Sequence, residues 1–380
     1  MSSDRPSART VPGLVLTGGG ARAAYQVGVL KGLAELFPDR PNPFRIIVGT
    51  SAGAVAAAVI AARARHWQRA IRAIEDVWAG FHVDQVFEVG GGQMLGSGLH
   101  WLGSLITGGL IAPPRSLFNN QPLRELLARN VSWSSLRRGL ARGDLDALAL
   151  CATSYSNSRS IAFFASRPGL AEWTRRMHVG RRAGLGLHHL MASLAVPFLF
   201  PPERIGNDYH GDGAMRQLAP LSPAAHLGAN RLLIIGVRGP LETAVNLPQP
   251  LHRMSPPGPG QLLGYALDNL FMDQVYADRE QMERVNQLVG CAPDLVPGAQ
   301  TIQTMLITPS EDPRDFAARH IHCLPRSLRA LLSVAGARDA RGSRLASYLM
   351  FEANYTQDLI ALGHRDALAL ASEIRAFLAH

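Results

Sequence analysis

The sequence predicts an α/β fold built on a mostly parallel sheet, and two strand-to-helix units near its beginning are the main reason. A strand-like run, LVLT at 14–17, precedes three glycines and a helix over 21–37 with apolar residues on one stripe. A second buried strand over 44–48 precedes an alanine-rich helix over 54–62, and a further one, RLLIIGV, lies at 231–237. Strands that alternate with helices need crossover connections, and such connections build parallel sheets.

The other predicted elements extend this α/β pattern toward a helical C-terminus. Asn120 is a candidate N-cap for a helix that begins at Gln121, because proline at the next position is tolerated in a first turn. The further predictions are helices over 66–79, 185–195, 325–334 and 344–378, and strands over 145–153 and 160–165 joined by a polar turn at 154–159. We therefore expect a flexible N-terminus over 1–11, an α/β domain over 12–238, a proline- and glycine-rich linker or excursion over 239–260, and a helical C-terminal region over 261–380 packed on that domain.

Composition places the chain among folded globular proteins. Its 380 residues are 47% hydrophobic and 18% charged, which excludes wholesale disorder. The three cysteines, Cys151, Cys291 and Cys323, are odd in number and widely spaced, and they indicate a reducing compartment. The first ten residues lack the apolar core of a secretory signal, so we expect a cytoplasmic protein. No cysteine or histidine spacing predicts a metal site.

Arginine supplies nearly all of the net charge of +9, since Lys31 is the sole lysine. One interpretation is attraction to an anionic surface, either phospholipid or nucleic acid. The other is a codon bias toward arginine and alanine across the genome. No nucleic-acid-binding module is visible in the sequence, and aromatic residues are not interleaved with the basic ones. We therefore expect no nucleic-acid partner.

The longest uncharged run, residues 89–114, contains too many glycines and prolines for a membrane-spanning helix. Its apolar residues include Trp101, a residue type that favours the membrane boundary. A lid or membrane-contact segment is one interpretation, with the chain peripheral at the inner face of the membrane. A surface loop with a short helix packed on the body is the other.

Ser51 lies in the pattern G-x-S-x-G, GTSAG at 49–53, between a predicted strand and a predicted helix. A nucleophile elbow uses this pattern, because a sharp strand-to-helix turn demands small residues two positions away on each side. The turn also places the serine at a helix N-terminus, where the helix dipole favours developing negative charge. The alternative is a tight connection without catalytic meaning.

The glycines Gly18, Gly19 and Gly20 form a loop between the first strand and the first helix. The loop matches G-x-G-x-x-G except at its last position, which is Ala23, so a dinucleotide site is one interpretation. An oxyanion hole made of backbone N–H groups is the other, with the positive charge of Arg22 nearby. In a parallel sheet this loop and Ser51 both lie at the carboxyl ends of adjacent strands.

Asp212 stands between two glycines, in a turn from which a carboxylate can project. Taken alone, the Asp-Gly pair indicates an ordinary turn. Three histidines, His210, His226 and His252, leave open a catalytic triad in the order Ser…Asp…His.

Taken together, these motifs resemble the patatin-like phospholipase family. GGGARA at 18–23, GTSAG at 49–53 and DGA at 212–214 occur in the order and spacing of that family, and MASLAVPFLFPP at 191–202 resembles its A-S-x-A-x-P-x-x-F-P-P stretch. The resemblance covers roughly residues 12–225 and implies a three-layer α/β/α sandwich. It also implies that Ser51 is the nucleophile and Asp212 the proton acceptor of a Ser–Asp dyad, with Gly18, Gly19 and Gly20 as the oxyanion loop.

The resemblance further implies that Arg22 holds the family's basic position and that no metal or other cofactor is needed. Ala23 departs from the family motif, which often has glycine there, but it lies beyond the expected oxyanion donors. A carboxylate is a weak base in water, with a pKa of about 4, so the dyad requires desolvation of Asp212.

The leading hypothesis is a lipid acyl hydrolase, a carboxylic ester hydrolase that acts on phospholipid or another lipid ester at a membrane surface. A non-catalytic lipid-binding or membrane-docking protein on the same fold is the alternative. A nucleotide-binding oxidoreductase would use the first glycine loop but leaves Ser51 and Asp212 unexplained.

Overall fold

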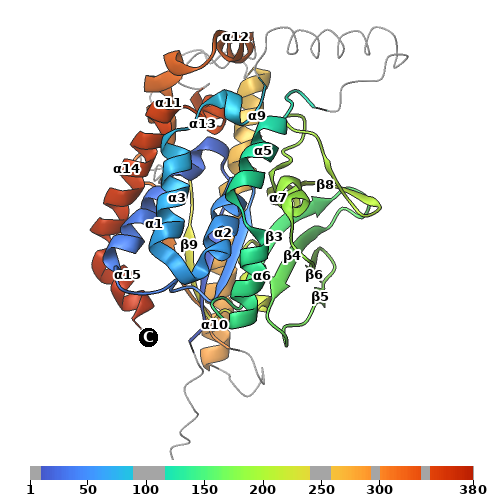
Figure 1. Cartoon of the computed structure of the whole chain (residues 1–380), viewed down its shortest axis with the longest axis vertical. Coiled ribbons are helices and arrows are strands. Elements are labelled where there is room, and N and C mark those ends of the chain that lie inside the picture. The colour runs from blue at the N-terminus through green and yellow to red at the C-terminus, as the bar shows by residue number, and fades with distance from the viewer. Residues whose placement is uncertain (1–9, 89–115, 240–257, 292–299, 335–342, 380) are drawn as a thin grey trace, which may run out of the picture.

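The computed structural model describes residues 10–88, 116–239, 258–291, 300–334 and 343–379 (Figure 1). Two sequence predictions, the flexible N-terminus and the lid or membrane-contact segment over 89–114, lie outside these residues except at positions 10 and 11. Most of the expected linker over 239–260 also lies outside them. The predicted domain boundaries therefore stay predictions.

A ten-stranded sheet forms the middle layer, with the order β10-β9-β1-β2-β3-β4-β6-β5 and with β8 and β7 continuing from β3. Its strands are β1 (Pro12–Leu16), β2 (Ile46–Thr50), β3 (Ala147–Ser154), β4 (Ser160–Ser166), β5 (Trp173–Thr174), β6 (His178–Arg182), β7 (Glu203–Ile205), β8 (Asp208–Asp212), β9 (Arg231–Ile235) and β10 (Gln303–Ile307). The five strands from β10 to β3 run parallel, whereas β4 and β8 are antiparallel to β3. The expected mostly parallel sheet is confirmed.

Helices cover both faces of this sheet (Figure 1). They are α1 (Ala24–Leu36), α2 (Ala52–Ala62), α3 (Trp67–Ala79), α5 (Gln121–Asn130), α6 (Trp133–Arg142), α7 (Leu187–Leu194), α8 (Ser222–His226), α9 (Pro259–Asp268), α10 (Gln274–Cys291), α11 (Pro313–His320), α12 (Arg326–Val334), α13 (Ser343–Leu349), α14 (Ala353–Ala369) and α15 (Ala371–Leu378). Alternate strand residues enter two separate cores, as the period of two in a strand requires. Leu14 and Ile47 pack with α1, α2 and α3, and Val15 and Val48 pack with α8 and α10. The layers are therefore α/β/α, as expected.

Two sequence predictions about the C-terminal region are corrected. The single helix expected over 344–378 is three helices, α13, α14 and α15, separated by short breaks. The region also contributes β10, an edge strand parallel to β9, where no strand is predicted from the sequence. Only the last residue of β10, Ile307, is fully buried. The five residues of β10 therefore show only a weak hydrophobic pattern from which a strand could be predicted.

Local details at two helix starts also differ from the prediction. The helix expected over 21–37 begins with a 3-10 turn, Gly20–Ala23, before α1. Asn120 occupies the N-cap position of α5, but its side chain makes no capping bond. The N–H of Gln121 donates instead to the side chain of Asn119, at 3.1 Å.

Helix α14 packs along α1 with the two backbones in near contact. A Cβ on Gly28 would lie 2.1 Å from the carbonyl oxygen of Ile360, and one on Gly363 would lie 2.2 Å from that of Tyr25. Only glycine fits at both positions, because any side chain there would collide with the backbone of the other helix. The C-terminal region is thereby packed directly on the helix that follows the glycine loop.

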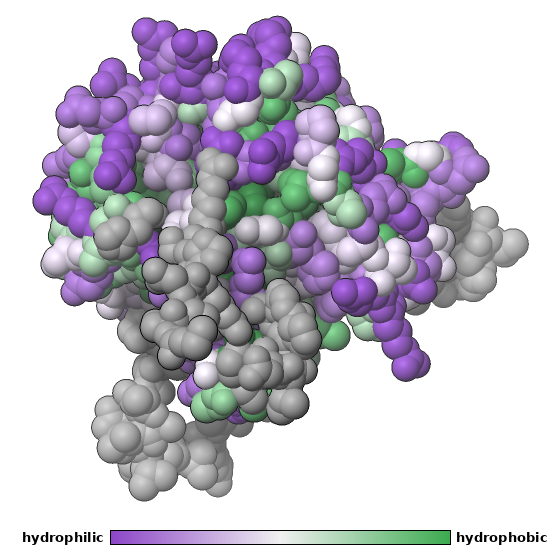
Figure 2. Space-filling model, turned by 90° about the horizontal axis from the view of Figure 1, so that it is seen from below, coloured by the Kyte–Doolittle hydropathy of each residue, from purple (hydrophilic) through white to green (hydrophobic). Residues whose placement is uncertain are grey.

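Hydrophilic side chains gather along the outer edge of the face seen from below, with smaller hydrophobic areas between them (Figure 2). None of the described helices combines the length and the apolar character needed to cross a membrane.

Candidate active site

Ser51 makes the turn between β2 and α2 by itself. The strand ends at Thr50 and the helix begins at Ala52. Ser51 has φ 53° and ψ −131°, a backbone conformation that residues other than glycine rarely adopt. Such strain is concentrated at functional sites, and a strained serine in this turn is the hallmark of a nucleophile elbow.

Close packing around the turn explains the two glycines of the motif. A Cβ on Gly49 would lie 2.5 Å from the Cα of Ala54, and one on Gly53 would lie 2.5 Å from the carbonyl oxygen of Leu16. Both clashes are with backbone atoms, which cannot move aside as a flexible side chain can. Helix α2 therefore starts directly against β1 only because these positions are glycine.

Ser193, on helix α7, holds the backbone of Ser51. The Ser51 N–H donates to the Ser193 hydroxyl at 3.0 Å, and Ser193 is fully buried. Ser193 is not among the predicted site residues, although it lies in the stretch 191–202 that resembles the family pattern. Its position within that stretch was the one feature of the sequence that could have indicated a role for Ser193 in the site.

Strand β3 brings Asp212 to Ser51. β3 pairs with β2 as far as Thr50 opposite Cys151, and with β8 at the next position, where Asp212 is opposite Ala152. Strand β4 occupies the other edge of β3, so β8 continues the line of β2. Asp212 consequently lies beside the residue that follows Thr50, which is Ser51.

The Asp212 carboxyl group is buried, with the residue only 1% exposed. Its Oδ1 accepts a hydrogen bond from the Ala214 N–H at 2.9 Å, while Oδ2 has no hydrogen-bond partner that meets normal geometry among the described residues. Burial raises the pKa of Asp212 to about 7, although the Ser51 hydroxyl and the Ala214 N–H both favour the charged form. A carboxylate with this pKa is a much stronger base than one in water.

The glycine loop lies against Ser51. A Cβ on Gly18 would be 3.0 Å from the Cβ of Ser51, so the two residues are neighbours in space. The N–H groups of Gly18 and Gly19 donate no hydrogen bond to any described residue. Free N–H groups beside a strained serine are the donors that an oxyanion hole requires.

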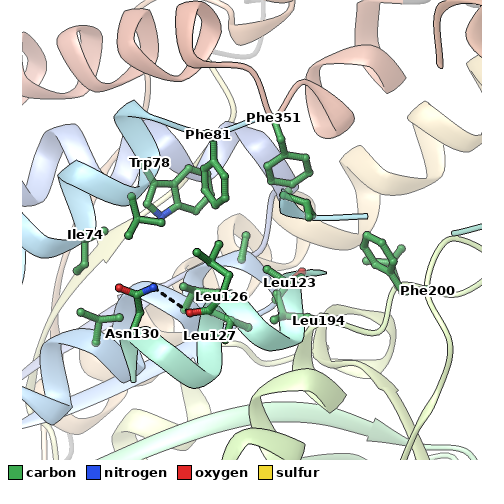
Figure 3. Close-up of a pocket in the computed structure, with 18 of the residues that line it drawn as sticks. Ile74, Trp78, Phe81, Leu123, Leu126, Leu127, Asn130, Leu194, Phe200 and Phe351 are labelled. Atoms are coloured by element: carbon green, nitrogen blue, oxygen red, sulfur yellow. Dashed lines mark hydrogen bonds between the residues drawn. The ribbon is translucent and has the colours of Figure 1, made fainter. Parts of the chain in front are cut away.

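An apolar pocket opens at Ser51 and runs between α2, α3 and α5 (Figure 3). Its empty space is about 760 Å³, including the part open to solvent. The wall on α2 is made by Val55 and Val59, one and two turns below Ser51. Most of the other lining residues are aliphatic or aromatic, among them Ile74, Trp78, Phe81, Leu123, Leu126, Leu127, Leu194, Phe200 and Phe351.

A family model for patatin-like phospholipases matches residues 14–225, which is more than half of the chain. The chain belongs to the patatin-like phospholipase family. No curated protein matches it closely enough to be counted as a relative.

Two examples from the solved structures that are similar to this patatin-like chain illustrate the likeness. Human GIVD cytosolic phospholipase A2 has a TM-score of 0.46 and 13% identity, with 99% of this chain and 61% of that chain covered. VipD from Legionella pneumophila has a TM-score of 0.36 and 14% identity, with 93% of this chain and 67% of the VipD chain covered. The patatin-like chain thus spans about two thirds or less of the length of these structures.

Arg22 of the patatin-like chain lies close to the glycine loop, but its charge is already paired. It is 1% exposed, and its guanidinium lies 2.9 Å from the carboxylate of Asp268. It also donates to the hydroxyl groups of Ser347 and Tyr348. These three partners all come from the C-terminal region, so Arg22 joins that region to the loop.

His210 and His226, two of the histidines considered for a triad, do not bond to Ser51 or Asp212 in the described part of the patatin-like chain. His210 is buried near Asp208, with 3.6 Å between its Nε2 and a carboxylate oxygen. His226 stacks on Trp173 in the distant β5 strand, with ring centroids 4.9 Å apart. His252 lies outside the described residues.

In the portion of the patatin-like chain that the structure describes, no three side chains of His, Cys, Asp or Glu come together as a metal site.

Ala23 lies next to the glycine loop. Its methyl group is buried in the core, and the residue is 2% exposed.

Proposed function

We propose that the chain is a lipid acyl hydrolase that cleaves carboxylic esters through Ser51 and Asp212. The observation that carries the proposal is a strained serine at the mouth of an apolar pocket, beside a buried carboxylate. Family membership supports a lipid ester as the substrate class. The pocket suits an acyl chain chemically, because it is lined almost wholly by apolar side chains.

In the proposed acylation step, the Ser51 oxygen attacks the ester carbonyl carbon while its proton passes to Oδ2 of Asp212. The carbonyl electrons move onto oxygen, and the N–H groups of Gly18 and Gly19 stabilise this oxyanion by roughly 3 kcal/mol per donor. Collapse of the tetrahedral intermediate breaks the bond to the leaving alcohol, which takes the proton from Asp212. The products are an acyl-serine and a free alcohol or lysolipid.

In the proposed deacylation step, Asp212 accepts a proton from a water molecule that attacks the acyl-serine. The same oxyanion donors serve again, and the Ser51 oxygen leaves with the proton from Asp212. The fatty acid is released and the enzyme is restored. A pKa of about 7 suits both halves of this cycle, because Asp212 must accept and return a proton near neutral pH.

We also propose that the substrate is met at a membrane surface, from the cytoplasmic side. Large apolar side chains on the described surface support this, among them Phe198 at 71% exposure and Tyr265 at 59%. Phe198 is held with φ 65°, a conformation that asparagine tolerates well. Phe198→Asn should therefore keep the backbone while weakening sedimentation with anionic vesicles, and Leu288→Asn on α10 is a matched control.

The alternative of a lipid-binding protein without catalysis would use the same pocket. A fluorophosphonate probe, which labels only activated serines, separates the two functions. We expect the wild type to be labelled, and Ser51→Ala and Asp212→Asn to lose labelling while His210→Gln and His252→Gln retain it. A folded wild type that never labels in the presence of vesicles would favour the binding protein. Labelling that survives Asp212→Asn and is lost with a histidine variant would identify a different base.

A further inference from the structure

The acyl pocket is not uniformly apolar. Below Ser51, its lining includes two side chains with polar atoms, Trp78 on α3 and Asn130 at the end of α5. Figure 3 shows the indole nitrogen of Trp78 turned toward the end of the pocket where Ile74 and Asn130 lie. A pocket for a plain hydrocarbon chain needs neither group.

The Trp78 N–H is a buried donor that lacks an acceptor. Trp78 is 2% exposed, and its Nε1 has no hydrogen-bond partner among the described residues. Phe81 and Phe351 fix the indole, with ring centroids 4.9 Å and 6.4 Å from that of Trp78. Leaving a buried donor without an acceptor costs about 1–3 kcal/mol of free energy. A ligand that brings an acceptor to the Trp78 N–H removes this cost and so gains affinity.

A comparison with Trp67 shows why the place of Trp78 matters. The Nε1 of Trp67 is also buried without a partner, but Trp67 packs on Phe44 in the core and does not line this pocket. A ligand in the pocket can reach only the Trp78 donor.

Asn130 lines the same part of the pocket and carries an acceptor atom. Its Nδ2 donates to the Leu126 carbonyl oxygen at 2.8 Å, which fixes the amide plane (Figure 3). The amide oxygen is then the group that can accept a hydrogen bond from a ligand. Together the two side chains offer one donor and one acceptor, which is what an alcohol group can satisfy.

Helix geometry places the Asn130 end of the pocket far from the ester. Ser51 to Val59 on α2 spans eight residues, or about 12 Å, and Leu123 to Asn130 on α5 spans about 10 Å. An oxygen recognised there belongs to the middle or distal part of an acyl chain. It does not belong to the carbons next to the carbonyl.

We propose that the pocket selects acyl chains that carry a hydroxyl group along the chain, with Trp78 donating to that oxygen and Asn130 accepting its proton. This inference rests on the proposed function for the acyl character of the ligand. The recognised substrate class is then the esters of mid-chain hydroxy fatty acids.

Binding to Ser51→Ala protein tests this without catalysis. Calorimetry would compare stearate with a series of hydroxystearates that differ in the position of the hydroxyl group. We expect one or a few positional isomers to bind about tenfold more tightly than stearate. Trp78→Phe in the same background should remove this preference, so that the hydroxystearates bind no more tightly than stearate does.

A second measurement does not depend on a variant that folds. In protein labelled with ¹⁵N-tryptophan, the Trp78 indole N–H resonance should move downfield with the preferred hydroxystearate and not with stearate. Equal binding of stearate and every hydroxystearate would overturn the inference, as would a preference that survives Trp78→Phe. Failure of the proposed function is separate, because it would show as absent fluorophosphonate labelling and ester hydrolysis whatever the binding preference.

Discussion

Thr50 and Asp212 take consecutive places along one edge of strand β3, opposite Cys151 and Ala152. The strand that delivers Ser51 therefore ends where the strand that delivers Asp212 begins. This arrangement fixes the serine and the carboxylate to the same rigid sheet, although 160 residues separate them in the sequence. Four predictions follow from it and from its surroundings.

The rate of ester hydrolysis should rise with pH and level off above about 7. Asp212 must be ionised to accept the Ser51 proton, and burial raises its pKa to about 7. Below that value kcat/KM should fall about tenfold per pH unit. Steady-state rates on a soluble ester would measure this, with circular dichroism at each pH as the control for folding. A midpoint near 4 would contradict a desolvated base.

Asp212→Asn should stabilise the folded protein above neutral pH while abolishing activity. The folded pKa of about 7 lies above the unfolded value of about 4, so the native state binds more protons between these values. The contribution of Asp212 to wild-type stability is therefore full below pH about 4 and is lost as pH rises through about 7. Asparagine avoids this loss because it stays neutral.

The expected gain from Asp212→Asn is on the order of a few kcal/mol at pH about 8 and near zero at pH about 4. Urea unfolding of both proteins at the two pH values would measure it. An equal effect at both values would mean that the substitution acts through packing and not through the charge of Asp212.

Ser193→Ala should slow fluorophosphonate labelling about 10- to 100-fold with only a modest loss of stability. The Ser193 hydroxyl accepts the Ser51 N–H and so holds the strained turn. Its loss leaves one buried N–H unpaired, at about 1–3 kcal/mol.

Ser154→Ala is the matched control for this experiment. Ser154 is equally buried, but its hydroxyl bonds to Asp208 and not to Ser51. If Ser193→Ala is labelled as fast as the wild type, Ser193 does not position Ser51. The same conclusion would follow if Ser154→Ala slowed labelling equally.

Asp268→Asn should destabilise the protein by about 3–5 kcal/mol, because it leaves the buried Arg22 guanidinium without its carboxylate. Arg344 also lies 3.0 Å from the Asp268 carboxylate, but it is partly exposed and can be hydrated. Urea unfolding would give the change in stability. Hydrogen exchange should show faster exchange in α13 and α14 than in β3.

The double variant Arg22→Met with Asp268→Leu is the control for the buried charge. It should recover part of the lost stability, because no unpaired ion remains. If the loss of stability in the double variant equals the sum of the losses in the two single variants, Arg22 and Asp268 do not stabilise the protein through their ion pair.

The local motifs could be read from sequence because short-range sterics dictate them. The turn at Ser51 requires small residues at fixed positions, so the pattern appears in the sequence itself. The partners of Arg22 could not be read in this way, since Asp268 is distant in the chain and nothing local marks it. The same holds for Trp78, whose apolar stripe on α3 looks like ordinary core.

The break between α13 and α14 illustrates tertiary packing that outweighs local preference. No glycine or proline interrupts residues 350–352, so local propensity favours a continuous helix. Phe351 instead turns into the wall of the apolar pocket at Ser51, and its burial outweighs the helical hydrogen bonds that are lost.

The contacts of Arg22 with Asp268, and of α1 with α14, set an order of events during translation. The ribosome releases Gly18, Ser51 and Asp212 well before it has made Asp268 and Gly363. A nascent chain that ends near residue 225 would carry every motif of the family and yet lack the residues that support its own glycine loop. We expect such a chain to be inert, so the proposed hydrolase activity would appear only after synthesis has reached α14.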